Sequence, residues 1–283
     1  MTLVAVFWPH VPRFPRQECT VKIGVCLKQV PASDSRIKIA GPSAGVDASD
    51  LKMEINPYDE FALEEALKLK DAKIAKQVVV FTVGGSDSEQ RIRDALARGA
   101  DGAVRLEDAS FEGSDSLGIA RILAAAAKKE GVDMVLAGKQ AIDDDNSQVP
   151  AMVAEILGWP QVTVVDKLEI SGDSFKAWRQ SGGGVRDVVS GGLPAVFSAD
   201  KGLNTPRYAK LRGIMMAKRK KIPVYDAGAL GLDPSSVGSA GAKVVQGNWS
   251  EPPARPPGRI LSGEVPSMVK ELVTLLRDEA KVL

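Results

Sequence analysis

The sequence predicts an α/β protein built on a Rossmann-like parallel sheet with helices on both faces. Short apolar segments alternate with amphipathic helical patterns from residue 21 to residue 157. Regular alternation of this kind favours parallel strands joined by helices. The chain has 283 residues, 44% hydrophobic and 26% charged, so it can bury one large core or two modest ones.

Each element of this alternation has a local signal. Apolar and β-branched runs predict strands at residues 21–27, 77–83, 103–106 and 132–137. Asn56 followed by Pro57 predicts a helix start, and Gly99 and Gly131 predict helix ends. The helices are therefore expected from Pro57 onward and at residues 87–98, 116–129 and 149–157. Residues 36–39 and 51–55 alternate weakly, which predicts a small surface hairpin.

The pattern changes after Trp159-Pro160. Short strands are predicted at residues 162–170, 175–179 and 193–197, with turns at 171–173 and 181–184. We further expect a short basic helix at 208–221, an extended arm rich in Gly, Pro and Ser at 226–258, and an amphipathic helix at 264–281.

These segments predict three parts of the chain. Residues 1–20 are expected to be a flexible extension or the product of an upstream start codon. Residues 21–225 form the α/β domain, which includes the basic segment 203–221. Residues 226–283 form an arm and helix apolar enough to need another surface, such as a partner chain.

Composition excludes several classes of function. The 37 basic and 36 acidic side chains nearly cancel, which indicates neither a nucleic-acid nor a membrane partner, and no apolar run is long enough to span a bilayer. Cys19 and Cys26 fit neither a zinc site nor a redox pair, and sparse cysteine favours a reducing compartment, here the cytoplasm. The only histidine is His10, so the folded part lacks the residue on which most acid–base and nucleophilic devices depend. We expect neither catalytic residues nor metal ligands.

Four loops are expected at the carboxyl ends of parallel strands, where ligands gather: residues 26–33, 56–59, 83–88 and 138–149. The last loop offers backbone N–H groups at a helix start, around Asn146 to Val149, which would attract an anion. The carboxylates of Asp143, Asp144 and Asp145 would then face elsewhere, toward ribose hydroxyls or an adenine amino group. Two alternatives stay open: Asp144 or Asp145 caps the helix, or the aspartates hold magnesium.

A second motif lies in the loop after the second main strand. Gly84-Gly85-Ser86-Asp87-Ser88 resembles the pyrophosphate loop of ATP pyrophosphatases. Val83 replaces the first serine of that loop, and the motif does not follow the first strand of the sheet. We therefore interpret it as a Ser/Asp helix N-cap.

The motifs together resemble the β subunit of electron transfer flavoprotein, from about Val21 to the C-terminus. Met134 to Asp145 nearly matches the family motif LVLAGKQAIDDD. The resemblance continues in KQVP at residues 28–31, MEINP at 53–57, LPAV at 193–196, LNTPRY at 203–208 and IMMAKRKK at 214–221. The aspartate loop and the LPAV-to-lysine block are highly specific in combination.

The resemblance implies an adenine-nucleotide-binding domain that pairs with a larger α subunit. The α subunit would hold most of a redox-active FAD, and this chain would bury a structural AMP. The implied nucleotide contacts are Cys26, Asn56, Pro57, Tyr58, Asp59, Val83, Gly138, Lys139, Gln140, Ala141, Ile142, Asp143, Asp144, Asp145, Asn146, Ser147, Gln148 and Val149. Ser33 would reach toward the flavin ring.

The resemblance also implies an electron carrier without turnover of its own. The heterodimer would accept electrons from flavin dehydrogenases, such as those of fatty acid oxidation acting on acyl-CoA, and pass them to a membrane quinone reductase or another acceptor. Leu211 would be the apolar anchor of the segment that recognises dehydrogenases. The implied partner-binding residues are Leu211, Ile214, Met215, Lys218 and Arg219.

The chain departs from the family pattern at a few positions. Ser147-Gln148-Val149 stands where the family usually has Asn-Gln-Thr, and acidic residues are replaced around 181–184. Three consecutive aspartates favour AMP over the second FAD of flavin-bifurcating relatives. Two other functions remain as alternatives: an ATP-pyrophosphatase-like ligase, and a nucleotide-sensing stress-type binding protein.

Overall fold

The computed structural model describes residues 21–41, 45–255 and 257–283, so the expected extension at residues 1–20 lies outside the described residues. The chain divides into two compact units. The described part of the first comprises residues 21–37 and 47–247. The described part of the second comprises residues 38–41, 45–46, 248–255 and 257–283.

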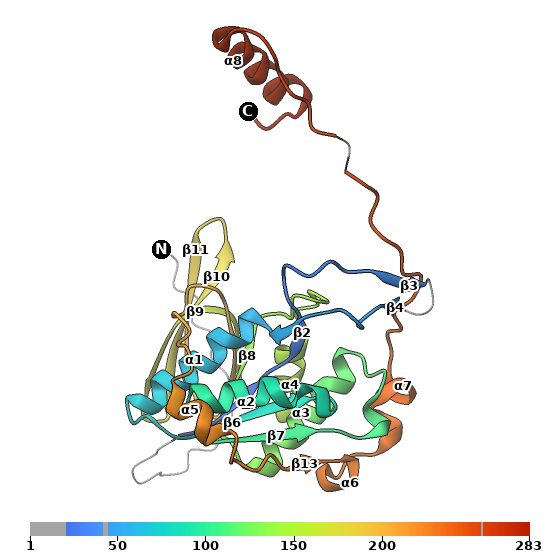
Figure 1. The fold of residues 1–283 in the computed structure, drawn as a ribbon. Helices are drawn as coiled ribbons and strands as arrows, with labels where there is room; N and C mark the ends of the chain where they lie inside the picture. Colours follow the sequence, from blue (N-terminus) through green and yellow to red (C-terminus); the bar gives the residue numbers. More distant parts are fainter. Residues whose placement is uncertain (1–20, 42–44, 256) are drawn as a thin grey trace. The chain divides into compact units, whose positions relative to one another are not determined.

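A mixed, mostly parallel sheet of nine described strands forms the centre of the first unit, which confirms the predicted fold class (Figure 1). Seven strands are parallel in the order β9-β12-β8-β1-β6-β7-β13. Their bounds are β9 Gln161–Ser171, β12 Ala195–Ala199, β8 Met134–Gly138, β1 Val21–Cys26, β6 Ala75–Val83, β7 Gly102–Leu106 and β13 Val224–Tyr225. Two antiparallel strands, β10 (Ser174–Gly182) and β11 (Val185–Gly192), extend the sheet beyond β9.

Helices cover both faces because the buried strands are apolar on both sides. In β6, Val78 and Val80 pack in the same core as α1 (Pro57–Asp71) and α2 (Glu89–Arg98). Val79 and Phe81 belong to the opposite core with α3 (Ser116–Glu130) and α4 (Val149–Leu157). The helix starts and ends at Pro57, Gly99 and Gly131 are confirmed.

The predicted hairpin between residues 36–39 and 51–55 is wrong. The strand β5 (Met53–Ile55) pairs antiparallel with β2 (Gln29–Pro31), directly after β1. In the second unit, β3 (Ile39–Gly41) pairs with β4 (Gly45–Val46). Weak alternation predicts extended backbone, but it does not predict which strand a segment pairs with. Here β5 pairs with the free edge of β2.

The extended arm predicted at residues 226–258 begins later than expected. Residues 227–241 form α6 (Ala227–Leu230), a 3₁₀ turn (Pro234–Ser236) and α7 (Gly238–Gly241). Asp226 and Asp233 cap the first two of these with their side chains. Ala227 and Val237 are buried in the α3 core, so small residues that suggested an unstructured arm instead allow close packing.

Three smaller differences concern strands and helix length. The sequence did not predict β11 or β13, and the basic helix expected at 208–221 is the shorter α5 (Leu211–Ala217). Strand β11 is half exposed, ends in Gly191 and Gly192, and directly follows three glycines at residues 182–184, so its pattern is that of a turn.

The second unit contains the expected C-terminal amphipathic helix. It is α8 (Val265–Thr274), continued by one π-helical turn (Leu275–Glu279). Val265, Val269 and Leu272 are exposed along it. Among the described residues, every helix is too short or too polar to cross a membrane.

Candidate functional site

Asp59 joins three loops at the carboxyl ends of β1 and β8. Its carboxylate accepts a hydrogen bond from the N–H of Lys28 at 2.7 Å and another from the N–H of Gly138 at 2.9 Å. Asp59 lies in the first turn of α1, where acidic side chains also favour the helix dipole. The start of α1 is therefore fastened to the ends of both strands.

Asn56 fastens the aspartate loop to the same helix. Its side-chain amide donates to the carbonyl of Gln140 at 2.8 Å and accepts from the N–H of Ile142 at 3.2 Å. Asn56 occupies the N-cap position of α1 but makes no side-chain capping bond. The expected cap is thus correct in position, while the amide serves the neighbouring loop instead.

Gly138 must be glycine for the start of α1 to pack against the end of β8. We call this contact region, where Asn56 and Asp59 bond to the neighbouring loops, the joint. A Cβ atom there would lie 2.7 Å from Tyr58 Cβ and 2.8 Å from the Tyr58 carbonyl carbon. Such contacts are well inside van der Waals distance. Tyr58 at the start of α1 therefore leaves no space for a side chain at the last residue of β8.

Lys28 forms ion pairs with two of the three aspartates in the loop. Its ammonium group lies 2.8 Å from Asp143 and 3.1 Å from Asp144. Burial opposes the charge on Lys28, but these two carboxylates outweigh it and raise the lysine pKa. Asp145 instead accepts a hydrogen bond from the Gln140 side chain at 2.5 Å. Lys28 therefore offsets part of the negative charge of the aspartate loop.

The loop backbone leaves N–H groups available at the start of α4. Asp145 and Ser147 have positive φ angles of 50° and 54°, a conformation that non-glycine residues seldom adopt. The Asn146 N–H donates to the Asp144 side chain. Within the described parts of the chain, the N–H groups of Ser147, Gln148 and Val149 donate to no acceptor.

Neither alternative for the aspartates is found in the structure. The N-cap of α4 is Gln148, with no side-chain capping bond, so Asp144 and Asp145 do not cap this helix. Among the residues that the structure describes, no group of three or more His, Cys, Asp or Glu side chains could hold a metal ion. The magnesium interpretation therefore gains no support.

Burial raises the pKa values of the two titratable side chains Asp59 and Cys26, near the end of β1. Desolvation raises the pKa of Asp59 to about 7, although the bonds from Lys28, Asn56 and Gly138 oppose this shift. Burial, and then the nearby Asp59 carboxylate, also raise the pKa of the Cys26 thiol. Cys26 is therefore a neutral thiol at physiological pH and not a nucleophile.

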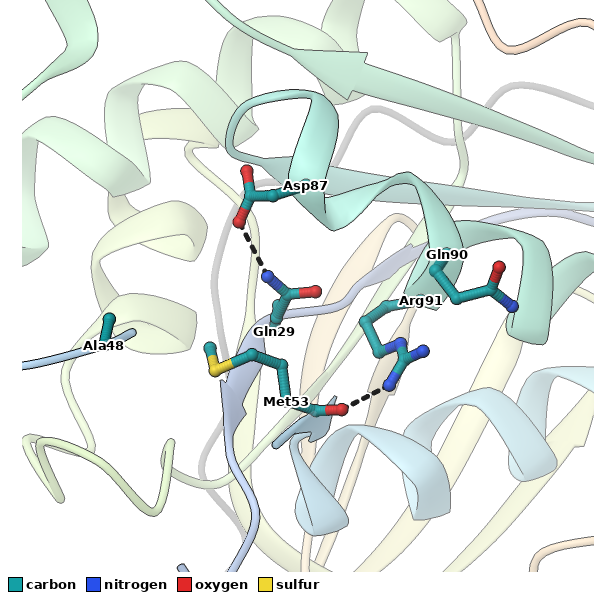
Figure 2. A pocket seen from close by; sticks show the side chains of 6 residues that line it. All are labelled: Gln29, Ala48, Met53, Asp87, Gln90 and Arg91. Carbon is teal, nitrogen blue, oxygen red and sulfur yellow. Dashed lines mark hydrogen bonds between the residues drawn. The ribbon is translucent and has the colours of Figure 1, made fainter. Parts of the chain in front are cut away.

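The loop after β6 borders a polar hollow of about 370 Å³, which Figure 2 shows from close by. Gln29 donates to Asp87 at 2.8 Å, and the Arg91 guanidinium donates to the Met53 carbonyl, both drawn as dashed lines in Figure 2. Ser88 holds the N-cap position of α2 without a side-chain capping bond, and its hydroxyl donates to the Gly85 carbonyl. The predicted N-cap is therefore correct in position, although its side chain makes no capping bond.

A second hollow, of about 430 Å³, lies between the aspartate loop and the strands β9, β10 and β12. Its lining includes Lys139, Ser147, Arg179 and Val164. Val164 has a φ of 59°, unusual for a β-branched residue. Lys139 pairs with Asp200 at 3.0 Å.

The basic segment exposes an apolar surface. In α5, Leu211 is 76% exposed and Met215 59%. Ile214 is also exposed, and so are Lys218 and Arg219 just after the helix. Leu211 is therefore not packed in the core of its own domain.

A family model described as the electron transfer flavoprotein domain matches residues 44–230. The electron transfer flavoprotein subunit beta of Bradyrhizobium diazoefficiens is 38% identical over 264 residues, covering 93% of this chain and 100% of its own length. That of Mus musculus is 41% identical over 236 residues, covering 83% of this chain and 90% of its own. The chain belongs to the electron transfer flavoprotein β-subunit family. A mitochondrial relative from Oryza sativa is 39% identical and covers 93% of this chain.

The electron transfer flavoprotein motifs fall where the structure gathers its loops. Asn56, Asp59, Gly138, Gln140 and Ile142 meet at one joint through the bonds described above. Tyr58 lies beside it, with the Lys139 ammonium 5.1 Å from its ring centre. Cys26 and Val83 end their strands at the same edge of the sheet, whereas the exposed Ser33 bonds through its N–H to Glu54.

Sequence reasoning did not identify several contacts that hold these loops in place. Lys28 contacts the aspartate loop through Asp143, and Gln29 donates a hydrogen bond to Asp87. Asp200 forms an ion pair with Lys139. The KQVP motif contains Lys28 and Gln29, so a signal existed. The contacts of this motif could not be predicted, because the partners of Lys28 lie 115 and 116 positions away in the sequence.

Proposed function

We propose that this chain is the nucleotide-bearing β subunit of a heterodimer that carries electrons. A larger α subunit would hold most of one FAD, and this subunit would hold AMP in a structural role. The pair would accept electrons from flavin dehydrogenases, such as acyl-CoA dehydrogenases, and deliver them to a membrane quinone reductase or another acceptor. The bound flavin supplies the redox chemistry, and this chain binds and orients it.

One observation carries the nucleotide part of the proposal. Three successive N–H groups, of Ser147, Gln148 and Val149, find no acceptor in the described chain although they lie at a helix start. Such a group of donors suits a phosphate. The carboxylates of Asp143 and Asp144 keep lone pairs beyond those used by Lys28, so they can also accept from a ribose or adenine.

The donor set therefore fits AMP, and the residues that would hold it are those implied by the family motifs. The experiment is to purify the chain with the product of its genomic neighbour, denature the complex and identify what is released. A yellow heterodimer that yields one FAD and one AMP supports the proposal. Release of two FAD molecules would replace AMP by a second flavin, and a colourless homodimer that turns over ATP would overturn the whole assignment.

Two further parts of the chain would serve partners. The exposed apolar face of α5, with Leu211 as its anchor and Lys218 and Arg219 at its rim, would dock dehydrogenases. The second unit, with its exposed apolar face on α8, would pack on the α subunit. Removal of residues 248–283 should then weaken the heterodimer, which size-exclusion chromatography at decreasing concentration measures.

We also propose the cytoplasm as the working compartment, because the sparse cysteine content favours a reducing environment. Fractionation of the source cells with antibodies to this chain tests that assignment. Signal in an organelle fraction would contradict it.

A further inference from the structure

The docking segment, residues 203–217, is fastened to α1 by a partly buried ion pair between Arg207 and Glu64. Glu64 on α1 is only 6% exposed. It receives two bonds from the Arg207 guanidinium, 2.8 Å from Nε to Oε2 and 2.9 Å from Nη2 to Oε1. The Arg207 backbone N–H donates to the same carboxylate at 3.0 Å, and Asp71 at the end of α1 contacts Arg207 Nη2 at 2.9 Å.

A second attachment lies three residues earlier in the segment. The Asn204 side-chain amide donates to the Phe61 carbonyl and to the buried Glu65, both at 2.9 Å. Leu203 is buried in the core beside α1. Residues 203–207 are therefore bound along two turns of one helix.

The far end of the segment is held by α2. The Arg93 guanidinium donates to the Ala217 carbonyl, the last residue of α5, at 2.7 Å. Gly213 packs so closely that a Cβ there would lie 3.1 Å from the Ala97 carbonyl carbon. Between these attachments, Tyr208 and Leu211 are 91% and 76% exposed. A rigid frame thus presents an apolar surface to solvent.

Stability alone does not explain why the segment is held by a charged pair whose carboxylate is buried. An apolar pair of similar volume is often as stable as a buried ion pair. Arg207 instead restricts orientation, because its planar guanidinium fits only one orientation of the Glu64 carboxylate. This contact fixes the position of the backbone that leads into α5. Binding surfaces gain affinity when such geometry is set before the partner arrives.

We propose that Glu64 and Arg207 are positioning residues that hold the Leu211 surface in the orientation required for docking an electron-donating flavoprotein. This inference rests on the proposed docking function of α5. It differs from that function because neither residue needs to touch the partner. The pair acts only through the backbone of residues 207–211.

The experiment uses the intact flavin-loaded heterodimer and a cognate dehydrogenase. Arg207→Lys keeps the charge but removes the fork, so the dehydrogenase concentration at half-maximal rate should rise roughly three- to tenfold. The maximal rate and the FAD and AMP contents should stay unchanged. Amide hydrogen exchange in residues 208–217 should become faster. Arg186→Lys, on an exposed edge-strand arginine, is the matched control and should alter none of these.

Leu211→Ala distinguishes a failure of this positioning inference from a failure of the proposed docking function of α5. If Leu211→Ala leaves the half-maximal concentration unchanged, the docking function of α5 is wrong. If Leu211→Ala raises it while Arg207→Lys changes neither that concentration nor the exchange rate, the positioning inference is wrong. Should Arg207→Lys prevent assembly, Asp71→Asn replaces it, since Asp71 is exposed and contacts only one nitrogen of the guanidinium; it should give a smaller shift in the same direction, and no shift overturns the inference.

Discussion

At the residue scale, Asp59 has an unusual combination of roles. It is buried, yet it accepts two backbone hydrogen bonds that hold three loops together. A carboxylate suits both donors, whereas burial favours the protonated form. The result is a structural acid whose pKa lies near physiological pH.

This pKa predicts how stability depends on pH. The pKa of Asp59 is raised from 3.8 to about 7 in the folded chain, so between these values the folded state binds more protons than the unfolded state. Stability should therefore fall as pH rises from about 4 to 7, by on the order of 2–4 kcal/mol, and then level off. Urea unfolding across this range measures the effect. Asp59→Asn should flatten the slope over that window, and an unchanged slope would assign it to other groups.

Val149 and Asp144 test whether backbone or charge holds the nucleotide. Val149→Pro removes an N–H that has no acceptor in the described chain, and it disfavours the helical backbone of Gln148. AMP retention by the heterodimer should fall about tenfold, the loss expected for a bond to a charged group. Asp144→Asn should be milder because it weakens an ion pair at the surface, while the amide oxygen can still accept hydrogen bonds from the Asn146 N–H and the nucleotide. Equal losses in the two variants contradict this geometry.

At the element scale, α1 is the helix that connects the parts of this subunit. Its first turn holds the aspartate loop through Asn56 and Asp59, and its middle turns hold the docking segment through Glu64 and Glu65. Its apolar side meanwhile fills the core beside β1 and β8. A shift of this one helix would disturb both proposed sites.

Gly138→Ala should produce such a shift. The added methyl would meet Tyr58, and overpacking of this kind costs about 1–3 kcal/mol. We expect a lower melting temperature together with weaker AMP retention. Gly247→Ala, where a Cβ would meet nothing within 4 Å, is the control. Normal AMP retention in a destabilised Gly138→Ala chain would show that the start of α1 is not part of the site.

Leu211→Ala is the corresponding prediction for α5. Truncation of an apolar anchor in a partner pocket can cost about 2 kcal/mol or more. Electron transfer from the dehydrogenase should slow while FAD content and melting temperature stay constant. Charge reversal at Lys218 and Arg219 should instead flatten the salt dependence of the rate. A melting temperature lowered by several degrees with transfer intact would contradict the docking role of Leu211.

At the scale of the whole molecule, the proposed function gives this chain only one wall of a flavin site. Aromatic residues make up only 5% of the chain, and ligand affinity depends on a largely enclosed, preorganised pocket. The isolated subunit should therefore bind FAD poorly. Gel filtration after incubation with FAD tests this, and stoichiometric flavin in the protein peak would contradict the shared site.

The sequence by itself determined the alternation of strands and helices, because periodicity and capping are local. Residues 149–157, Gly99 and Gly131 show this directly, since each lies where its local signal indicates. The family motifs also identified the loops around Asn56 and Gly138. These signals require only neighbouring residues.

Only the tertiary structure decided which groups meet. The pairing of β2 with β5, the Lys28 contacts with Asp143 and Asp144, and the Glu64–Arg207 pair each join residues far apart in the chain. Local pattern carries no information about such partners, because they depend on how the sheet orders its strands. The same lack of information made residues 227–241 resemble a loose arm, although Val237 is fully buried once α3 supplies the surface that covers it.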